Sequence, residues 1–488
     1  MVAAAPVPSP VPDVVSTPME TEYTKDYVKE DGNLIEADQE EITGCSIPFM
    51  FLLCAPKMAM NMSWAAQWAA LGPLLQVLLS PSAVQAVQLV GPTTGLLIAP
   101  TVGVLCDANT HSWGRRRPFL FWGAITSAIC WAIMMNSTAI GESLGDKGDD
   151  RTWTTVFVVI CYVWMDITVN ITQVPASLII ADFAGNRQVT AASIGGGYSI
   201  AGSFVVSGFI MFFGPAHQHI QAFLGMLIAI MLITTMTVCY FVKEIPYKPA
   251  VKPPTGQMLK DAFVAVWVGI RKLPKTLAVY CIVFLLVQYG YTAYNGEKGQ
   301  FFGLTVKGGI ADDADKCGKS GRPECSERQT LYNDGVQLAG GLTDTIFNLF
   351  GLCYLACMPF LVRKLGVKTV ITASIIPQAL LIIMAYCKVI AIDMIIVIAC
   401  SITQQMIFSL QIPMIIHHIG HGYDNNLGLF SGAMNSANCM GQFLNFIFAS
   451  VLVRSSMGHA LPILVGGILS AIGFFVSFFF LKVDMHSM

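Results

Sequence analysis

The sequence predicts an all-α membrane protein with twelve transmembrane helices in two six-helix, pseudo-symmetric halves. Of its 488 residues, 54% are hydrophobic and only 12% are charged, whereas about a quarter of a soluble domain is charged. Its apolar segments have the length of a bilayer span, about 20 helical residues. A basic stretch separates the sixth segment from the seventh. Because lipid offers no hydrogen-bond partners to the backbone, such segments must be helical.

These segments divide the chain into five regions. Residues 1–45 are polar, rich in proline and acidic, which predicts a disordered cytosolic tail. Residues 46–242 are expected to form the N-terminal half, residues 243–275 a cytoplasmic central loop, residues 276–482 the C-terminal half and residues 483–488 a cytosolic tail. The expected spans are residues 48–78, 83–106, 118–138, 154–181, 189–213, 220–242, 276–303, 334–362, 368–387, 389–413, 426–453 and 459–482.

The charges of the loops predict an orientation. Basic residues of membrane proteins favour cytoplasmic loops, and the residues from Arg115 to Arg117 lie between the second and third spans. Arg363 and Lys364 lie in the matching loop of the second half, which indicates an internal repeat. Both termini are then expected in the cytoplasm. The plasma membrane is the expected location, with a vacuolar membrane as the alternative.

The loop between the second and third spans also contains a candidate cytoplasmic gate. Asp107 ends the second span. Arg115, Arg116 and Arg117 precede the third. Because a guanidinium group pairs well with a carboxylate, these residues are expected to form a charge latch that opens and closes. The alternative is that the arginines only set the topology.

Cys317 and Cys325 lie in a loop that the same orientation places outside. In an oxidising space they can form a disulfide; the alternative is two free cysteines. No cysteine pair or Cys/His cluster has the spacing of a zinc site, so no metal is expected. The net charge of −2 gives no indication of nucleic-acid binding.

Asp166 lies near the middle of the fourth span, where an ionisable side chain costs roughly 2.5–3.5 kcal/mol to insert. It is therefore expected to face an internal cavity. Asn170 and Gln173, four and seven residues later, share its helical face. Because burial favours the protonated form of a carboxyl group, Asp166 is a candidate proton-coupling residue. The alternatives are a structural hydrogen bond or a pair with a lysine such as Lys57.

Several spans combine aromatic rings with amides, which suits a sugar. Flat rings pack against the C–H face of a sugar, and amides pair with its hydroxyl groups. The candidate substrate-binding residues are Trp64, Gln67, Asn170, Gln173, Gln288, Tyr291, Asn295, Asn435 and Gln442.

Six sequence motifs stand out along the chain: SWAAQWAALGPLLQ, VGPTTGLLIAPTVGVLCD, WGRRRPF and DITVNITQVPASLIIADFAG in the first half, and YNDGV and GLFSGAMNSANCMGQ in the second. Together they resemble plant sucrose transporters. The chain is thereby similar to the glycoside–pentoside–hexuronide cation symporters of the major facilitator superfamily, over roughly residues 47–482. The resemblance implies a two-lobed major facilitator fold, alternating access, and uptake of sucrose or a related glucoside with a proton. It assigns the buried aspartate of the family's fourth helix to Asp166.

The chain departs from the plant pattern at charged positions. Ser177 and Gln337 stand where plant members have arginines, and Asn295 and Gln300 stand near their acidic positions. Losing arginines together with acids keeps the charge balance, so the departures can be coupled. They leave the identity of the sugar and the proton route open.

The expected function is proton-coupled symport of sucrose or a related glycoside. The alternative is an uncoupled facilitator or a sugar sensor of the same fold, which the missing charges favour. An enzyme is not expected, because no nucleophile–base set, metal motif or phosphate loop lies in or near the spans. No cofactor is expected, with the proton as coupling ion. The expected partners are a small sugar, protons and the bilayer, and the sequence does not indicate an oligomeric state.

Overall fold

The computed structural model describes residues 27–30, 33–36, 45–147, 150–184, 187–244, 246, 254–317, 325–419 and 427–483. By its internal contacts the chain forms two compact units, Met1–Thr43 and Gly44–Met488.

The smaller unit contains a short hairpin where the sequence predicts a disordered tail. β1 (Tyr27–Glu30) and β2 (Asn33–Glu36) pair antiparallel, with Val28 opposite Ile35. The sequence expectation for this tail did not include these strands. Val28 and Ile35 are β-branched and favour strands, and the Asp-Gly pair between the two strands in the sequence favours tight hairpins. The other residues of the predicted tail lie outside the described residues.

The N-terminal half is helical over most of each predicted span. Its elements are α1 (Ile47–Cys54), α2 (Pro56–Ala66), the π-helical turn η1 (Gln67–Leu71), α3 (Gly72–Leu78), α4 (Pro81–Gln88), α5 (Val90–Asp107), α6 (Arg117–Met135), α7 (Ser137–Leu144), α8 (Thr152–Ala184), α9 (Gln188–Phe213) and α10 (Ile220–Phe241). The first predicted span is thus interrupted: Pro56 begins α2, and η1 is a π-helical turn. Turns of this kind often occur at functional sites.

The C-terminal half is also built of helices with local π turns. Its elements are α12 (Lys275–Asn295), α13 (Lys298–Gln300), η3 (Phe301–Val306), η4 (Ala314–Lys316), α14 (Glu327–Gln337), η5 (Leu338–Thr343), α15 (Asp344–Leu365), α16 (Val367–Ala379), α17 (Leu381–Tyr386), α18 (Ile390–Ser409), α19 (Gln411–Ile419), α20 (Leu427–Leu452) and α21 (Ala460–Phe480).

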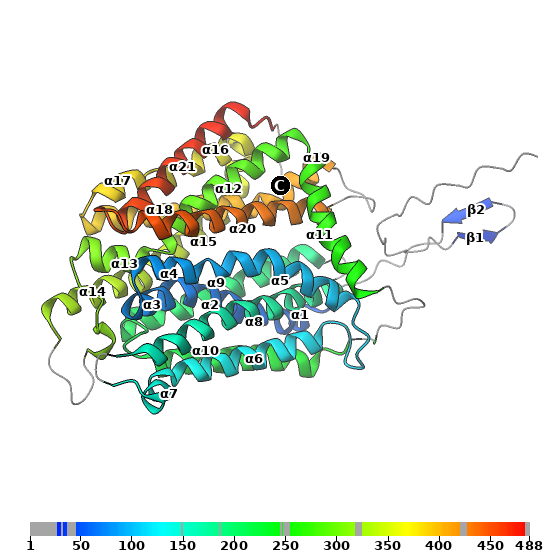
Figure 1. The fold of residues 1–488 in the computed structure, drawn as a ribbon. Helices are drawn as coiled ribbons and strands as arrows, with labels where there is room; N and C mark the ends of the chain where they lie inside the picture. The colour runs from blue at the N-terminus through cyan, green and yellow to red at the C-terminus, as the bar shows by residue number, and fades with distance from the viewer. Residues whose placement is uncertain are drawn as a thin grey trace, which may run out of the picture. The chain divides into compact units, whose positions relative to one another are not determined.

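Each half has a hydrophobic core of its own. The largest cluster of buried apolar side chains in the first half draws only on residues 59–231, and the largest in the second half only on residues 277–481. Small residues allow close helix packing within a half: a Cβ on Gly290 of α12 would lie 2.6 Å from the carbonyl oxygen of Gly466 in α21. Figure 1 shows α12, α16 and α21 on one side of the bundle and α6, α8 and α10 on the other.

The described chain contains ten helices that are long and apolar enough to cross a membrane. The protein is therefore an integral multi-pass membrane protein. Two further helical segments, residues 47–78 and 427–452, stand where the first and eleventh spans are predicted. By their position in the sequence they complete the predicted set of twelve.

The predicted central loop contains a helix, α11 (Thr255–Arg271). It contacts α5 of the first half and α20 of the second. Figure 1 shows α11 and α19 at one end of the bundle and α7 and α14 at the other. We call the end with Arg115–Arg117 and α11 the arginine face, and the end with α7, α14, Cys317 and Cys325 the disulfide face.

Candidate functional site

Asp166 lies in the middle third of α8 and is fully buried. Gln67 of η1 donates from Nε2 to Tyr162 Oη at 2.8 Å and approaches Asp166 Oδ2 at 3.4 Å. Asp166 Oδ1 has no hydrogen-bond partner among the described residues. Gly91 of α5 packs closely here, since a Cβ on it would lie 3.1 Å from Gln67 Nε2. The carboxyl group is thus enclosed by α5, α8 and η1, with one acceptor oxygen unused.

The other polar residues of α8 contact neighbouring helices of the same half. Asn170 Nδ2 donates to Thr94 Oγ1 of α5 at 3.1 Å and to the carbonyl oxygen of Asp166 at 2.8 Å. Gln173 Oε1 accepts from Trp64 Nε1 of α2 at 2.5 Å. The helical spacing read from the sequence therefore places both amides between helices.

Lys57 of α2 contacts a residue other than Asp166. Its Nζ donates to Ser177 Oγ at 2.7 Å. Ser177 stands where the family resemblance implies an arginine, so an ammonium group from another helix reaches the position that lacks one. This partnership joins residues 120 positions apart, and no local pattern predicts it.

A cavity of about 170 Å³ lies between the two halves. Its wall is formed by α2, η1 and α9 of the first half and by α12, α13 and α15 of the second. Three predicted binding residues, Trp64, Tyr291 and Asn295, line it. Trp68, Tyr294, Lys298, Asp344 and Asn348 are also among its lining residues.

Two buried charged contacts in this region were missed by sequence reasoning. Lys298 Nζ pairs with Asp344 Oδ2 in the cavity wall, and Glu297 pairs with His459, which precedes α21. The signal in the sequence was the adjacent pair Glu297–Lys298 within an apolar segment, because charged side chains inside the membrane need partners. The partners themselves lie 162 and 46 residues away.

The remaining predicted binding residues lie away from the cavity wall that the structure describes. Gln67 and Asn170 contact Asp166, and Gln173 accepts from Trp64, as described above. Gln288 Nε2 donates to Gln404 Oε1 at 3.1 Å inside the C-terminal half. Gln442 Nε2 donates to Asn438 Oδ1 at 3.0 Å, and Asn435 is exposed on α20.

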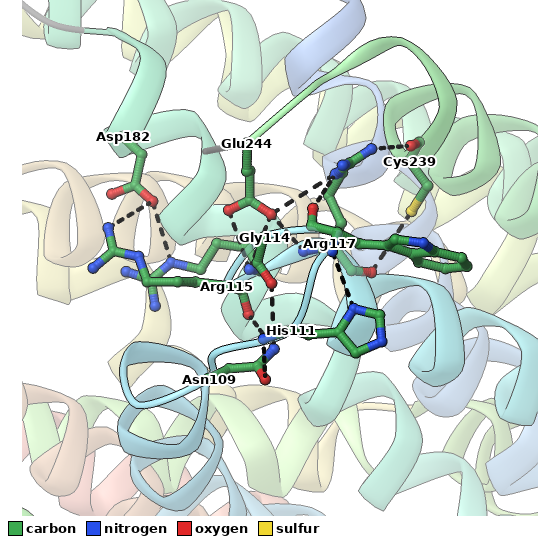
Figure 2. A network of polar contacts seen from close by, with 10 residues as sticks. Asn109, His111, Gly114, Arg115, Arg117, Asp182, Cys239 and Glu244 are labelled. Atoms are coloured by element: carbon green, nitrogen blue, oxygen red, sulfur yellow. Dashed lines mark hydrogen bonds and ion pairs between the residues drawn. The ribbon is translucent and has the colours of Figure 1, made fainter. Parts of the chain in front are cut away.

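The arginine face carries a network of ion pairs and hydrogen bonds (Figure 2). Arg116 Nε lies 3.2 Å from Asp182 Oδ2, and Arg115 shares this carboxylate at 3.9 Å. Arg117 Nε lies 3.9 Å from Glu244 Oε2. The Glu244 carboxylate also accepts the backbone N–H groups of Arg116 and Arg117 at 2.9–3.1 Å.

These contacts give the predicted latch two acidic partners that the sequence reasoning did not name. Asp182 lies near the end of α8, and Glu244 follows α10. The backbone of Asp107 ends α5, while its side chain lies outside the described part of the structure. Because Asp182 belongs to the first half and Glu244 begins the predicted central loop, the contacts described here tie the arginine loop to the ends of α8 and α10.

Cys317 and Cys325 are joined as a disulfide. Two residues before Cys317, Asp315 binds Arg151 of the first half through two hydrogen bonds of 3.0 and 2.9 Å. Both side chains are less than a fifth exposed. This pair therefore holds the two halves together at the disulfide face.

Further contacts between the halves lie at the same face. Tyr332 Oη donates to the carbonyl oxygen of Pro73 at 3.2 Å. Gln337 Nε2 donates to the carbonyl oxygen of Met211 at 3.1 Å. Gln300 is fully buried in α13, close to Gly72 of α3. Two of the uncharged residues at the family's charged positions, Gln300 and Gln337, thus take part in the contact between the halves.

Sequence comparison relates the chain to membrane transporters. A family model described as MFS/sugar transport protein matches residues 55–265. The sucrose transport protein SUC3 of Arabidopsis thaliana is 30% identical over 252 residues, which are 46% of this chain and 42% of that protein. The sucrose transport protein SUT3 of Oryza sativa subsp. japonica is 26% identical over 362 residues, 67% of this chain and 66% of that protein. The chain thus matches less than two thirds of the length of these relatives.

Comparison with solved structures supports the fold. The crystal structure of a D-xylose-proton symporter has a TM-score of 0.59 and 14% identity, and covers 90% of this chain and 98% of its own. That of nucleoside transporter NupG has a TM-score of 0.55 and 13% identity, and covers 90% of this chain and 100% of its own. At such identities the likeness concerns the fold alone. The predicted fold class and the predicted resemblance are confirmed.

Proposed function

We propose that this chain, a sucrose-transporter-like protein of the major facilitator superfamily, carries a sugar across the membrane together with a proton by alternating access. Its relatives are transporters and not enzymes, in agreement with the sequence prediction. We place it in the plasma membrane with both termini in the cytoplasm, following the distribution of basic loops.

The environment of Asp166 is the observation that carries the proposal. The carboxyl group is fully buried, has one long hydrogen bond from Gln67, and has an unused acceptor oxygen among the described residues. The described ion pairs give it no cation. An unpaired buried charge is costly, so the protonated form is favoured in this enclosed state. Release of the proton then requires that a conformational change bring water or a cation to the group.

Sucrose or a related glycoside is the proposed substrate. The names of the relatives support this class, and the central cavity supplies indole rings, phenols and amides. Its volume of about 170 Å³ is below the roughly 300–1,000 Å³ of ligand pockets. The halves must therefore move apart to admit a disaccharide, which alternating access provides.

Uptake of labelled sucrose tests the proposal. Cells expressing the wild-type chain should accumulate sucrose faster at acidic than at neutral external pH, and a protonophore should abolish the accumulation. Asp166→Asn should abolish uphill accumulation because the amide cannot carry the proton. The matched control is Asp393→Asn. Asp393 is a second fully buried aspartate, in α18, and its substitution should leave uphill accumulation in place. Unchanged accumulation in the Asp166→Asn variant, with wild-type surface expression, refutes the coupling role.

The second candidate is an uncoupled sugar facilitator or a sensor of the same fold. The uncharged residues Ser177, Asn295, Gln300 and Gln337 at the family's charged positions favour it. Initial sucrose influx that is insensitive to pH and protonophore would identify a facilitator. Sugar binding without flux would identify a sensor.

A further inference from the structure

Lys298 and Asp344 form an ion pair in the wall of the central cavity. Their side chains are only 5% and 15% exposed. Lys298 begins α13 directly after the end of α12, and Asp344 begins α15 after the π-helical turn η5. Taking two charges out of water costs several kcal/mol per ion before they attract each other. A pair kept at such a place therefore calls for a functional explanation.

The neighbouring residue fixes the position of Lys298. Glu297 is fully buried and bonded to His459 at the start of α21. Lys298 reaches in another direction, to α15. At the break between α12 and α13, Glu297 is thus bonded to His459 beside α21, and Lys298 to Asp344 of α15. These contacts position the ammonium group of Lys298 within this half.

The opposite wall of the cavity is aromatic. Trp64 and Trp68 of the first half line it. The ring of Trp68 stacks on Phe446 of α20, with centroids 5.8 Å apart and planes at 5°. Tyr294 also lines the cavity, is 1% exposed, and its hydroxyl group has no hydrogen-bond partner among the described residues. The cavity thus has an aromatic side, a charged pair, and an unpartnered hydroxyl group.

We propose that Lys298, Asp344 and Tyr294 bind the hydroxyl groups of the carried glycoside, while Trp64 and Trp68 contact its C–H face. A carboxylate accepts hydrogen bonds from two hydroxyl groups at once, and an ammonium group donates up to three. Hydrogen bonds to charged groups are the stronger ones. Because the two charges of the pair cancel, the set fits a neutral polyhydroxylated ligand.

This inference rests on the proposed sugar transport and assigns sugar binding and proton coupling to different residues. The polar contacts to the sugar come from α12, α13 and α15, whereas Asp166 lies in α8 of the other half. Binding and proton coupling can therefore be separated by mutation. Loss of the pair should weaken binding, and loss of Asp166 should leave binding in place while accumulation is lost.

The test is sugar binding to the purified full-length chain, measured by calorimetric titration with sucrose, maltose and methyl α-D-glucoside. The double variant Lys298→Met with Asp344→Leu removes both charges at similar volume, a change that buried pairs often tolerate. It should bind the preferred sugar at least about tenfold more weakly, since hydrogen bonds to charged groups are lost. Asp166→Asn should bind within about threefold of the wild type.

A matched control removes another lysine–aspartate pair of the same half. Lys307 and Asp334 lie 3.5 Å apart, with side chains 21% and 50% exposed, and neither lines the central cavity described here. Lys307→Met with Asp334→Leu should leave sugar affinity unchanged. Equal weakening in this control would attribute the effect to general destabilisation and overturn the inference.

The charge-reversed variant, Lys298→Asp with Asp344→Lys, covers the case in which the neutral variant does not fold. It keeps an ion pair but exchanges the donor and acceptor positions, so weak binding is expected again. Wild-type affinity in a folded neutral or reversed variant shows that the pair is only structural. If the wild-type chain itself binds none of the three sugars, the proposed function fails, and the subsite fails with it.

Discussion

At the scale of single residues, two of the enclosed carboxyl groups of this molecule, those of Asp166 and Asp344, differ in what surrounds them. Asp166 has only a long contact with Gln67, whereas Asp344 has the ammonium group of Lys298 beside it. An uncompensated carboxyl group suits proton exchange, and a paired one suits hydrogen bonding in the charged form. The same residue type thus serves two proposed roles, and the difference comes from its neighbours.

A third aspartate, Asp146, has a structural role at the disulfide face. Its carboxylate accepts from the N–H group of Trp153 at 2.9 Å, and from the N–H and hydroxyl groups of Thr154 at 2.8 Å each. Burial opposes the charge, but these hydrogen bonds and Arg151 outweigh it and lower the pKa of Asp146 from the usual 3.8. A carboxyl group with a lowered pKa in the folded state stabilises the fold above its usual pKa. This contribution is lost as pH falls through the folded-state pKa.

Asp146→Asn should therefore lower the melting temperature of the purified protein at pH 6, because the amide cannot accept three hydrogen bonds as a carboxylate does. The difference from the wild type should shrink as pH falls below 3.8, because the unfolded chain then takes up a proton that the folded wild type binds only at lower pH. Thermal unfolding in detergent between pH 3 and pH 7 measures this. Glu142→Gln, at an exposed position of α7, is the control. A pH-independent difference would contradict the assignment.

At the scale of helices, close packing of α2 against α9 depends on one glycine. A Cβ on Gly202 of α9 would lie 2.2 Å from the carbonyl oxygen of Met58 and 2.8 Å from the backbone nitrogen of Met62. Gly202→Ala must push the helices apart, at a cost of roughly 1–3 kcal/mol. A lower melting temperature is expected, together with weaker sugar binding, because α2 carries Trp64.

Gly208 of the same helix provides the comparison for Gly202. Nothing lies within 4 Å of a Cβ built on it, and alanine is the better helix former. Gly208→Ala should therefore keep or slightly raise the melting temperature. Equal effects of the two substitutions would show that helix propensity, and not the contact between α2 and α9, sets the stability at these sites.

At the scale of the whole molecule, the contacts described here close the disulfide face between the halves. The Arg151–Asp315 pair, the Tyr332–Pro73 contact and the Gln337–Met211 contact all cross from one half to the other. On the arginine face, Asp182 and Glu244 join the arginine loop to the ends of α8 and α10, and α11 contacts both α5 and α20. In alternating access, contacts that close one face must be broken to expose that face.

Arg151→Ala should shift the protein towards states that are open at the disulfide face, because it leaves Asp315 without its two hydrogen bonds from the other half. Spin labels attached through unnatural amino acids at the exposed positions 142 and 327 report the distance between α7 and α14 by double electron–electron resonance. A longer and broader distance distribution is expected. Lys307→Ala, whose pair with Asp334 lies within one half, should leave it unchanged. Identical distributions for the wild type and Arg151→Ala would refute the role of the pair.

The sequence by itself determined the helical membrane architecture, the division into halves and the depth of Asp166. These predictions follow from the properties of the lipid. The hydrocarbon core of a bilayer requires apolar helices, and a carboxylate within such a helix must face the protein interior. It also predicted Trp64, Tyr291 and Asn295 at a common site, because amides and aromatic rings stand out in apolar spans. The hairpin of β1 and β2 and the helix α11 were missed, since the surrounding charged and proline-rich composition indicated irregular chain.

Only the tertiary structure decided which polar groups meet. Lys298 pairs with Asp344, and Glu297 pairs with His459. Lys57 donates to Ser177, and the arginine loop pairs with Asp182 and Glu244. The helical period tells which side chains share a face, but it does not tell which face of a distant helix lies opposite. That choice depends on the packing of whole helices and on breaks such as those before α13 and α15. Partners between 46 and 162 residues apart are therefore fixed by the fold and not by any local pattern.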